Sequence, residues 1–152
     1  MPLTIIAVGR KHEDWVADGI ERYQKRLKAP FLVKWVLLPH SSYEANRARQ
    51  DESERLLSRL DAHAYVVLLD EKGKMLDSPK LSEILVEHLD KSDEVVLIIG
   101  GAYGVDESVH TRADLVWSLS SLVFPHQLVR LILVEQLYRA QQIALGGPYH
   151  HE

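Results

Sequence analysis

Residues that could bind anionic groups or transfer protons are concentrated near the end of the chain. Glu135 and Arg139 lie four positions apart in an apolar segment, and the sequence ends in PYHHE, which includes Tyr149 and His150. An imidazole can accept a proton near neutral pH, a guanidinium can bind phosphate or carbonyl oxygens, and a tyrosine ring can stack on a base. Because chain ends usually fray, we interpret this polar, aromatic ending as part of an active site completed by a second subunit.

The spacing of Glu135 and Arg139 has a second interpretation, which the sequence leaves open. Opposite charges at positions i and i+4 stabilise a helix by roughly 0.2–0.5 kcal/mol without any further role. Within so apolar a segment, the same pair could instead hold the arginine at the mouth of a site.

Three segments marked by glycine or proline lie at the ends of predicted strands. They contain Leu69 and Asp70, the glycines of GGAYG at 100–104, and the run SLSSLVFPH at 118–126. Ligands of open α/β sheets bind beyond the carboxyl ends of the strands, where all three segments would meet. Their apolar side chains and backbone amides favour a flat heteroaromatic ligand over a polyphosphate. The glycine spacing does not match a dinucleotide fingerprint, and taken alone it could mark only a turn.

Several other kinds of site are absent from the sequence. There is no cysteine, which excludes a disulfide framework, a cysteine-bound zinc and a cysteine nucleophile, and fits a reducing cytoplasm. His126, His150 and His151 fit no common ligand spacing, so we expect no metal. We find no signal peptide and no apolar run near the ~20 residues that span a bilayer. We therefore expect a cytoplasmic protein without membrane contact.

The charge of the chain limits how it could bind nucleic acid. The net charge is −4 and the pI is near 6.1, which argues against a broad basic footprint. An enzyme acting on nucleic acid remains possible if its basic residues are local. Six of the 18 Lys and Arg residues lie within the first 28 positions, together with four acids. That stretch could equally be a solvated helix face.

The hydrophobic pattern predicts the elements that must position these residues. Short apolar runs and helical periodicities alternate, which indicates one α/β domain over 1–152 with a mostly parallel sheet covered by helices on both faces. Expected strands lie at 3–9, 31–39, 64–70, 94–101 and 114–120. Expected helices lie at 13–28 and 43–60, after an N-cap at Ser78, after Asp106, and at about 126–144.

The last predicted helix is apolar around well over half of its circumference. Such a helix packs against two surfaces, of which one is its own sheet. The other could be the same helix of a partner in a two-fold dimer, or the helix could be deeply buried in a monomer. A domain of 152 residues has little room for the second arrangement, so the dimer is preferred.

Three segments of the chain resemble a known family. LIIGGAYG, WSLSSLVFPHQLVRLILVEQLYRA and the terminal PYHHE are similar to SPOUT-class methyltransferases of large-subunit ribosomal RNA, specifically the single-domain RlmH (YbeA-like) group. The resemblance covers the whole chain. It implies an α/β fold with a C-terminal trefoil knot, a homodimer, and S-adenosyl-L-methionine as methyl donor. It also implies transfer to N3 of pseudouridine 1915, in helix 69 of 23S rRNA, within assembled ribosomes.

The resemblance also assigns roles to individual residues. It implies cofactor contacts from three loops, made by Leu69, Gly101, Ser120, Ser121, Leu122, Val123, Phe124 and Pro125. It places His126, Arg139, Tyr149 and His150 at the substrate and the methyl-transfer site. The chain departs from the family pattern at Ala102-Tyr103 and at His151, where relatives often have arginine. A cofactor-binding dimer with another substrate, or a ribosome-associated module without activity, remains an alternative.

Overall fold

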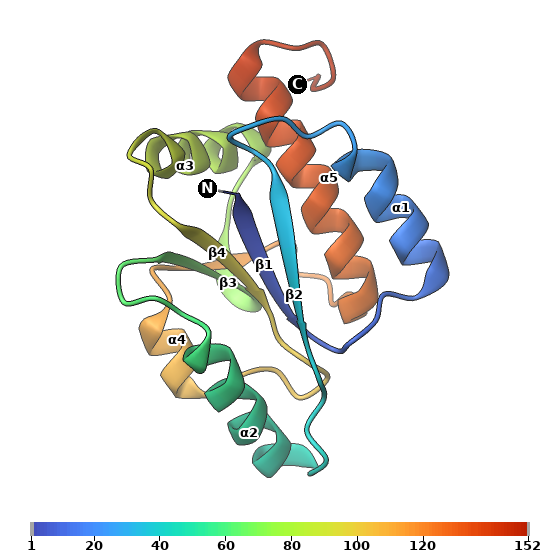
Figure 1. The fold of residues 1–152 in the computed structure, drawn as a ribbon, viewed down its shortest axis with the longest axis vertical. Coiled ribbons are helices and arrows are strands. Elements are labelled where there is room, and N and C mark those ends of the chain that lie inside the picture. The colour runs from blue at the N-terminus through green and yellow to red at the C-terminus, as the bar shows by residue number, and fades with distance from the viewer. Residues whose placement is uncertain (1, 152) are drawn as a thin grey trace.

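The computed structural model describes residues 2–151 and contains one five-stranded sheet in which all strands are parallel (Figure 1). The strands occur in the order β2-β1-β4-β3-β5, and every pair between them is parallel. Their bounds are Leu3–Val8 for β1, Val33–Leu38 for β2, Tyr65–Met75 for β3, Val95–Ile99 for β4 and Leu115–Ser118 for β5. The α/β class and the parallel sheet expected from the sequence are confirmed.

Five helices cover both faces of this sheet. Their bounds are Asp14–Gln24 for α1, Ala45–Ser58 for α2, Ser78–Asp90 for α3, Glu107–Arg112 for α4 and His126–Leu145 for α5. Figure 1 shows α1, α3 and α5 on one face and α2 with α4 on the other. None of the helices within residues 2–151 combines the length and apolar composition needed to cross a bilayer.

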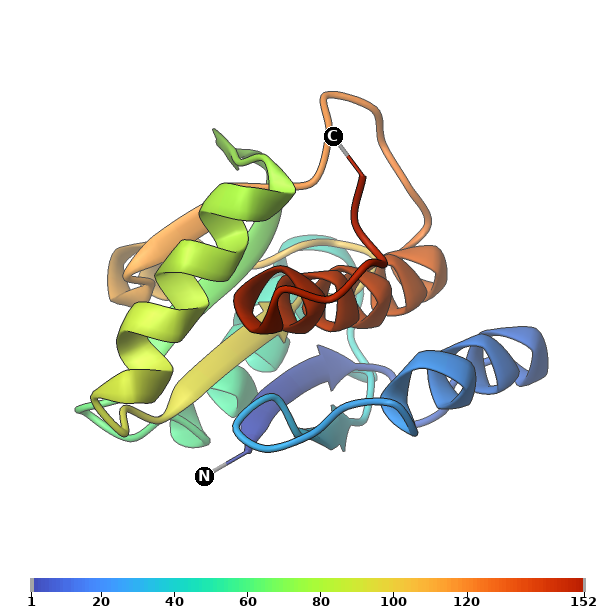
Figure 2. The ribbon, with the colours of Figure 1, turned by 90° about the horizontal axis from the view of Figure 1, so that it is seen from above.

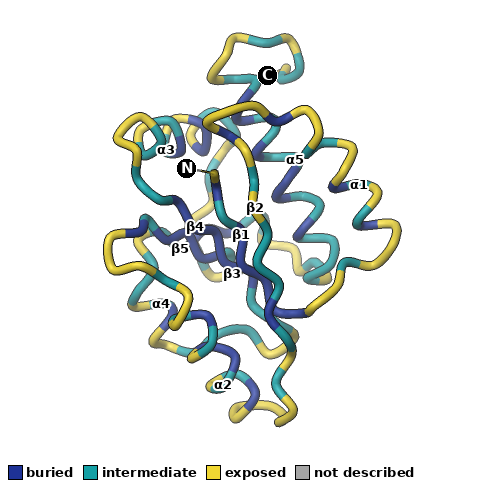
Figure 3. Tube along the Cα trace, in the orientation of Figure 1, coloured by how far each residue is buried: buried dark blue, intermediate teal, exposed yellow. Residues whose placement is uncertain are grey.

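The core consists of two layers separated by the sheet. Alternate strand residues point to opposite faces, so Ile5 and Leu97 belong to the layer under α1, α3 and α5, whereas Ile6 and Ile98 belong to the layer under α2 and α4. All five residues of β4 are buried, and the buried segments of the trace follow the sheet (Figure 3). This two-sided burial explains why the strands are continuous apolar runs.

Helix α5 lies between α1 and α3, as the view from above shows (Figure 2). Leu133, Val134 and Leu137 are fully buried. The side chain of Leu131 packs against Gly19 of α1. The helix begins at the edge of the sheet where the strands end, and its own end lies at the opposite edge (Figure 1). Its left-handed C-cap is Gly146, with φ 70°.

Two local predictions were wrong. The N-cap of α3 is Asp77, whose carboxylate accepts a hydrogen bond from the Lys80 amide, and the Ser78 hydroxyl instead donates to Gln136 on α5. Strand β3 continues to Met75, beyond the end predicted at residue 70, with a shift in its register against β5. Gly73 makes this continuation possible, because a Cβ there would lie 2.6 Å from the Val116 backbone.

Candidate functional site

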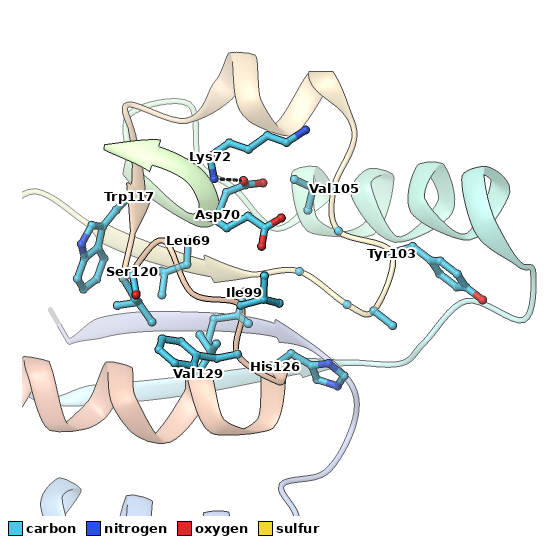
Figure 4. A pocket seen from close by; sticks show the side chains of 18 of the residues that line it. Leu69, Asp70, Lys72, Ile99, Tyr103, Val105, Trp117, Ser120, His126 and Val129 are labelled. Atoms are coloured by element: carbon cyan, nitrogen blue, oxygen red, sulfur yellow. Dashed lines mark hydrogen bonds between the residues drawn. The ribbon is translucent and has the colours of Figure 1, made fainter. Parts of the chain in front are cut away.

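A cavity of about 540 Å³ opens at the carboxyl edge of the sheet (Figure 4). Its walls come from β3 and from the loops after β4 and β5, with contributions from α2, α4 and the start of α5. The lining residues are Arg49, Leu69, Asp70, Glu71, Lys72, Ile99, Gly100, Gly101, Ala102, Tyr103, Gly104, Val105, His110, Trp117, Leu119, Ser120, Leu122, Val123, Phe124, His126 and Val129.

Six of the eight residues predicted to bind cofactor line this cavity. They come from three segments that are distant in sequence: Leu69 lies within β3, Gly101 follows β4, and Ser120, Leu122, Val123 and Phe124 follow β5. Ser121 and Pro125 belong to the third loop but do not line the cavity. His126, predicted to act on the substrate, lines it as well.

The loop after β4 approaches its neighbours so closely that Gly101 tolerates no side chain. A Cβ at Gly101 would lie 2.8 Å from Oε1 of Glu52 and 3.1 Å from Cγ1 of Val8. The loop closes through a hydrogen bond of 3.0 Å from the Gly104 amide to the Gly101 carbonyl, and Gly104 has a φ of 73°. Bare backbone therefore forms this wall of the cavity.

The loop after β5 presents apolar side chains to solvent. The Ser118 hydroxyl donates to the Ser120 carbonyl at 2.8 Å, and the Leu122 amide donates to the Ser120 hydroxyl at 3.0 Å. These bonds fix the loop, while Leu122 and Val123 are 68% and 77% exposed. Two neighbouring exposed aliphatic side chains at a cavity mouth indicate a surface that a ligand or partner covers.

His126 lies beside a fully buried arginine. The Arg130 guanidinium donates to the carbonyl oxygens of Val8 at 3.0 Å and Gly9 at 3.2 Å, and it also contacts Lys11 and His12. Burial lowers the pKa of His126 below its usual value, and the positive charge of Arg130 lowers it further. At neutral pH His126 is therefore a neutral imidazole at the cavity, able to accept a proton.

Replacing Arg130 with methionine is expected to raise the pKa of His126 and to destabilise the fold by about 3 kcal/mol. The substitution removes the second cause of the lowered pKa and leaves buried carbonyl groups without their donor. NMR titration of the imidazole and denaturant unfolding measure the two effects. Arg22→Met, on the exposed face of α1, is the control and should change stability by less than about 0.5 kcal/mol. An unchanged His126 pKa in the Arg130 variant would contradict this account.

A second cluster of predicted residues lies at the other end of α5. Arg139 donates to the Glu135 carboxylate at 3.0 Å and contacts Nδ1 of His150 at 3.2 Å. The Tyr149 hydroxyl donates to the same carboxylate at 3.2 Å. Burial, followed by hydrogen bonding to Tyr23 and the charge of Glu135, raises the pKa of Tyr149 to about 12, so Tyr149 remains neutral.

The structure separates this cluster from His126 within one chain. His126 and Arg139 lie thirteen positions apart on one helix, which corresponds to about 20 Å. His150 lines a second cavity of about 670 Å³, between α3, β5 and α5. Trp117, Leu119 and Phe124 line both cavities, so the cavity that contains His150 adjoins the loop after β5, whereas His126 lines the first cavity.

Comparison with known proteins identifies the family. A family model described as "Predicted SPOUT methyltransferase" matches residues 1–150. The chain belongs to the SPOUT methyltransferase family. A relative from Geobacter metallireducens, named ribosomal RNA large subunit methyltransferase H, is 42% identical over 153 residues, which cover 99% of each chain. A protein of the same name from Desulfitobacterium hafniense (strain DCB-2) is 40% identical and also covers 99% of each chain.

A solved structure supports the fold of this SPOUT methyltransferase. A methylase family protein from Neisseria gonorrhoeae superposes with a TM-score of 0.55, covering 99% of this chain and 85% of the other. At 9% identity this likeness shows the shared fold alone. The functional residues of the present chain must therefore be argued from its own geometry.

The polar rim of the cavity contains two residues that the sequence did not reveal, Arg49 and His110. Nε2 of His110 lies 3.3 Å from Asp70, which also accepts a hydrogen bond from the Lys72 amide, and Arg49 reaches the rim from α2. No group of three or more possible metal ligands occurs within residues 2–151. Arg49 and His110 come from helices on the far face of the sheet, so no local pattern in the sequence associates them with the cavity.

Proposed function

We propose that this chain uses S-adenosyl-L-methionine to methylate N3 of pseudouridine 1915, in helix 69 of 23S rRNA, within assembled ribosomes. The observation that carries the proposal is the convergence of the three predicted cofactor loops on one cavity. The full-length relatives named ribosomal RNA large subunit methyltransferase H support the same substrate class. A ribosomal substrate would place the activity in the cytoplasm.

The cavity suits an adenosine-based cofactor. Its volume of about 540 Å³ lies in the usual range for sites of small ligands, and its walls combine apolar side chains with glycine backbone. Gly100, Gly101 and Gly104 line the cavity without side chains, which leaves their backbone open to a ligand. Leu69, Gly101 and the segment 120–125 would hold the cofactor. When bound, S-adenosylmethionine supplies a methyl group already activated by its sulfonium.

The protein must orient the target base and manage its proton. As the bond between N3 and the methyl carbon forms and the bond between sulfur and that carbon breaks, the N3 proton has to leave. His126 lies at the cavity as a neutral imidazole and can take up this proton. Arg139 can bind a phosphate or a base carbonyl, and Tyr149 can stack on an exposed base.

Replacing His126 with asparagine is expected to lower kcat by about 10²-fold, the lower range for a general base. The active form is the neutral imidazole, so wild-type kcat should fall as pH drops below 6.5 and through the lowered pKa of His126. The asparagine variant should lose this acidic limb. Single-turnover rates measured from pH 5 to 8 test the assignment, and an acidic limb that persists in the variant would refute it.

We propose that Arg139, Tyr149 and His150 serve this cavity from a second subunit. A two-fold axis crossing α5 near Ile132, midway between His126 and Arg139, would place the tail of one subunit beside the cavity of the other. Ile132 lines the second cavity next to Phe124, and the exposed Leu122 and Val123 adjoin it. We therefore propose a homodimer with composite sites. We also propose the C-terminal trefoil knot that the family resemblance implies.

The proposal is tested by calorimetric titration with S-adenosylmethionine, with NADH titrated in parallel, and by light scattering. Binding of S-adenosylmethionine alone by a species of twice the monomer mass is expected. Ribosomes lacking the modification should then gain one methyl group at pseudouridine 1915, detected by mass spectrometry of the isolated rRNA fragment. Cofactor binding without methylation of ribosomes would favour the alternative, a methyltransferase dimer acting on another substrate.

A further inference from the structure

Two arginines and two tyrosines lie around the start of α2 and the outer rim of the cavity, on the side of the sheet away from α5. Tyr43 precedes α2, Arg47 and Arg49 lie near its start, and Tyr103 is in the loop after β4. Both tyrosines are exposed, at 44% and 45%. We refer to these four residues as the arginine–tyrosine patch. Arg49 and Tyr103 line the cavity mouth, and Figure 4 shows the Tyr103 ring extending outward from the loop.

The contacts within the arginine–tyrosine patch leave guanidinium N–H groups and faces of the tyrosine rings free to bind a partner. Nε of Arg49 donates to the Tyr103 carbonyl at 2.8 Å, and this is its one hydrogen bond to the described residues, so both terminal nitrogens remain open. The Arg47 guanidinium lies over the Tyr43 ring at 3.7 Å. That contact uses one face of the guanidinium and leaves its N–H groups at the edge for an anion.

The segment that carries Tyr43 is fixed by hydrogen bonds to α2. The Ser41 amide donates to Glu52 at 2.9 Å, its hydroxyl donates to Asp51 at 2.7 Å, and the Tyr43 amide donates to that hydroxyl at 3.1 Å. The patch is thus pre-organised before any partner arrives, which reduces the entropic cost of binding.

The charges of the patch are unfavourable for the isolated helix. Positive side chains near a helix start oppose its macrodipole, and the first turn of α2 contains no acidic residue to offset them. Glu44 immediately precedes the helix but forms no capping hydrogen bond. Asp51, the next acid along the chain, is held by Arg55 at 3.0 Å. Side chains whose charge is unfavourable for their own helix often serve in binding a partner.

We propose that the arginine–tyrosine patch binds single-stranded RNA adjacent to the target base. Guanidinium groups bind phosphates, and tyrosine rings stack on unpaired bases, which is the combination that single-stranded RNA requires. The inference rests on the proposed function, because the patch borders the cavity where the base would react. The patch lies on the face opposite the proposed dimer contact, so RNA would be held between it and the tail of the partner subunit.

The test uses three variants: Arg47→Gln, Arg49→Gln and the double variant that combines them. The control is Arg59→Gln, at the exposed far end of the same helix. The KM for ribosomes lacking the methyl group is measured at several salt concentrations. In the double variant, KM should rise at least about fivefold, and the slope of log KM against log salt should fall by about 1.4, which corresponds to two lost phosphate contacts. The kcat value and the Kd for S-adenosylmethionine of Arg47→Gln, and all values of the control, should stay the same.

A binding assay separates failure of this inference from failure of the proposed function. Fluorescence anisotropy with a labelled single-stranded RNA oligonucleotide requires no methyl transfer, and the double variant should lose the binding that the wild type shows. An unchanged salt slope together with weaker S-adenosylmethionine binding in Arg49→Gln would assign Arg49 to the cofactor carboxylate and overturn the proposal. A change of mass in light scattering would make the patch a contact between copies and would also overturn it. If the wild type methylates ribosomes and the double variant has the same KM, the RNA-binding role of the patch is refuted. The proposed function would then still stand.

Discussion

Valine in place of Gly101 is expected to abolish S-adenosylmethionine binding and, with it, all methyl transfer. The Cβ would lie 2.8 Å from Oε1 of Glu52 and 3.1 Å from Val8, and the branches of valine would extend further. Both neighbours are confined, because Val8 is buried in the sheet and Glu52 is 3% exposed and accepts a hydrogen bond from the Ser41 amide through Oε2. The loop must then move into the space that the cofactor needs.

Calorimetry and thermal unfolding with and without cofactor measure the effect. Cofactor at 100 times its Kd should stabilise the wild type by about 2.7 kcal/mol and should leave the valine variant unchanged. Gly146→Ala is the matched control, since it strains a left-handed residue with open space around it, far from the cavity. Both variants should lose stability, but only Gly101→Val should lose the cofactor. Binding by Gly101→Val within threefold of wild type would exclude this role for the loop.

The positions of most elements follow from the sequence because local and global preferences agree. Strands buried on both faces are continuous apolar runs, and Asp106 caps α4 as its sequence position predicts. The wrong predictions concern residues whose partners are distant. Ser78 is one position from the true cap and bonds to Gln136 instead, a partner 58 residues away. The extension of β3 depends on how Gly73 packs against β5.

The candidate site could be predicted only as far as the sheet geometry determines it. Leu69 pairs with Ile99 and Trp117 near the ends of the neighbouring parallel strands, and Gly101 and Ser120 follow those strands, so the sheet topology brings the three together. Arg130 could not be found in this way, because an arginine in a helix carries no sign that its partners are carbonyl groups more than 120 residues earlier. Its effect on the pKa of His126 is visible only in three dimensions.

The tail shows a different limit of sequence reasoning. The spacing of Glu135 and Arg139 predicted an ion pair, and the structure adds Tyr149 and His150 to the same carboxylate and guanidinium. The pair is therefore more than a helix-stabilising contact, because it anchors the end of the chain to α5. One chain nevertheless leaves this cluster about 20 Å from His126, so its proposed role depends on the dimer.

Deleting residues 149–152 is expected to abolish methyl transfer while leaving the Kd for S-adenosylmethionine within about twofold of wild type. The deletion removes Tyr149 and His150 from Arg139, and none of the lining residues of the main cavity lies in the tail. Calorimetry and methylation of ribosomes measure the two quantities on the same preparation. Full activity of the shortened chain would end the idea that the tail takes part in the reaction.

Mixed dimers of the shortened chain and Gly101→Val are expected to recover activity, although each variant alone has none. In the mixed dimer, the intact cavity of the shortened chain receives the intact tail of the valine variant. Random pairing of equal amounts gives one half mixed dimers, each with one working site of two, so about one quarter of wild-type activity should return. Co-expression with two different affinity tags isolates the mixed dimers. The purified mixed dimers should show about one half of wild-type activity. No recovery in verified mixed dimers would mean that the tail acts within its own subunit, whereas recovery requires a site built from both chains.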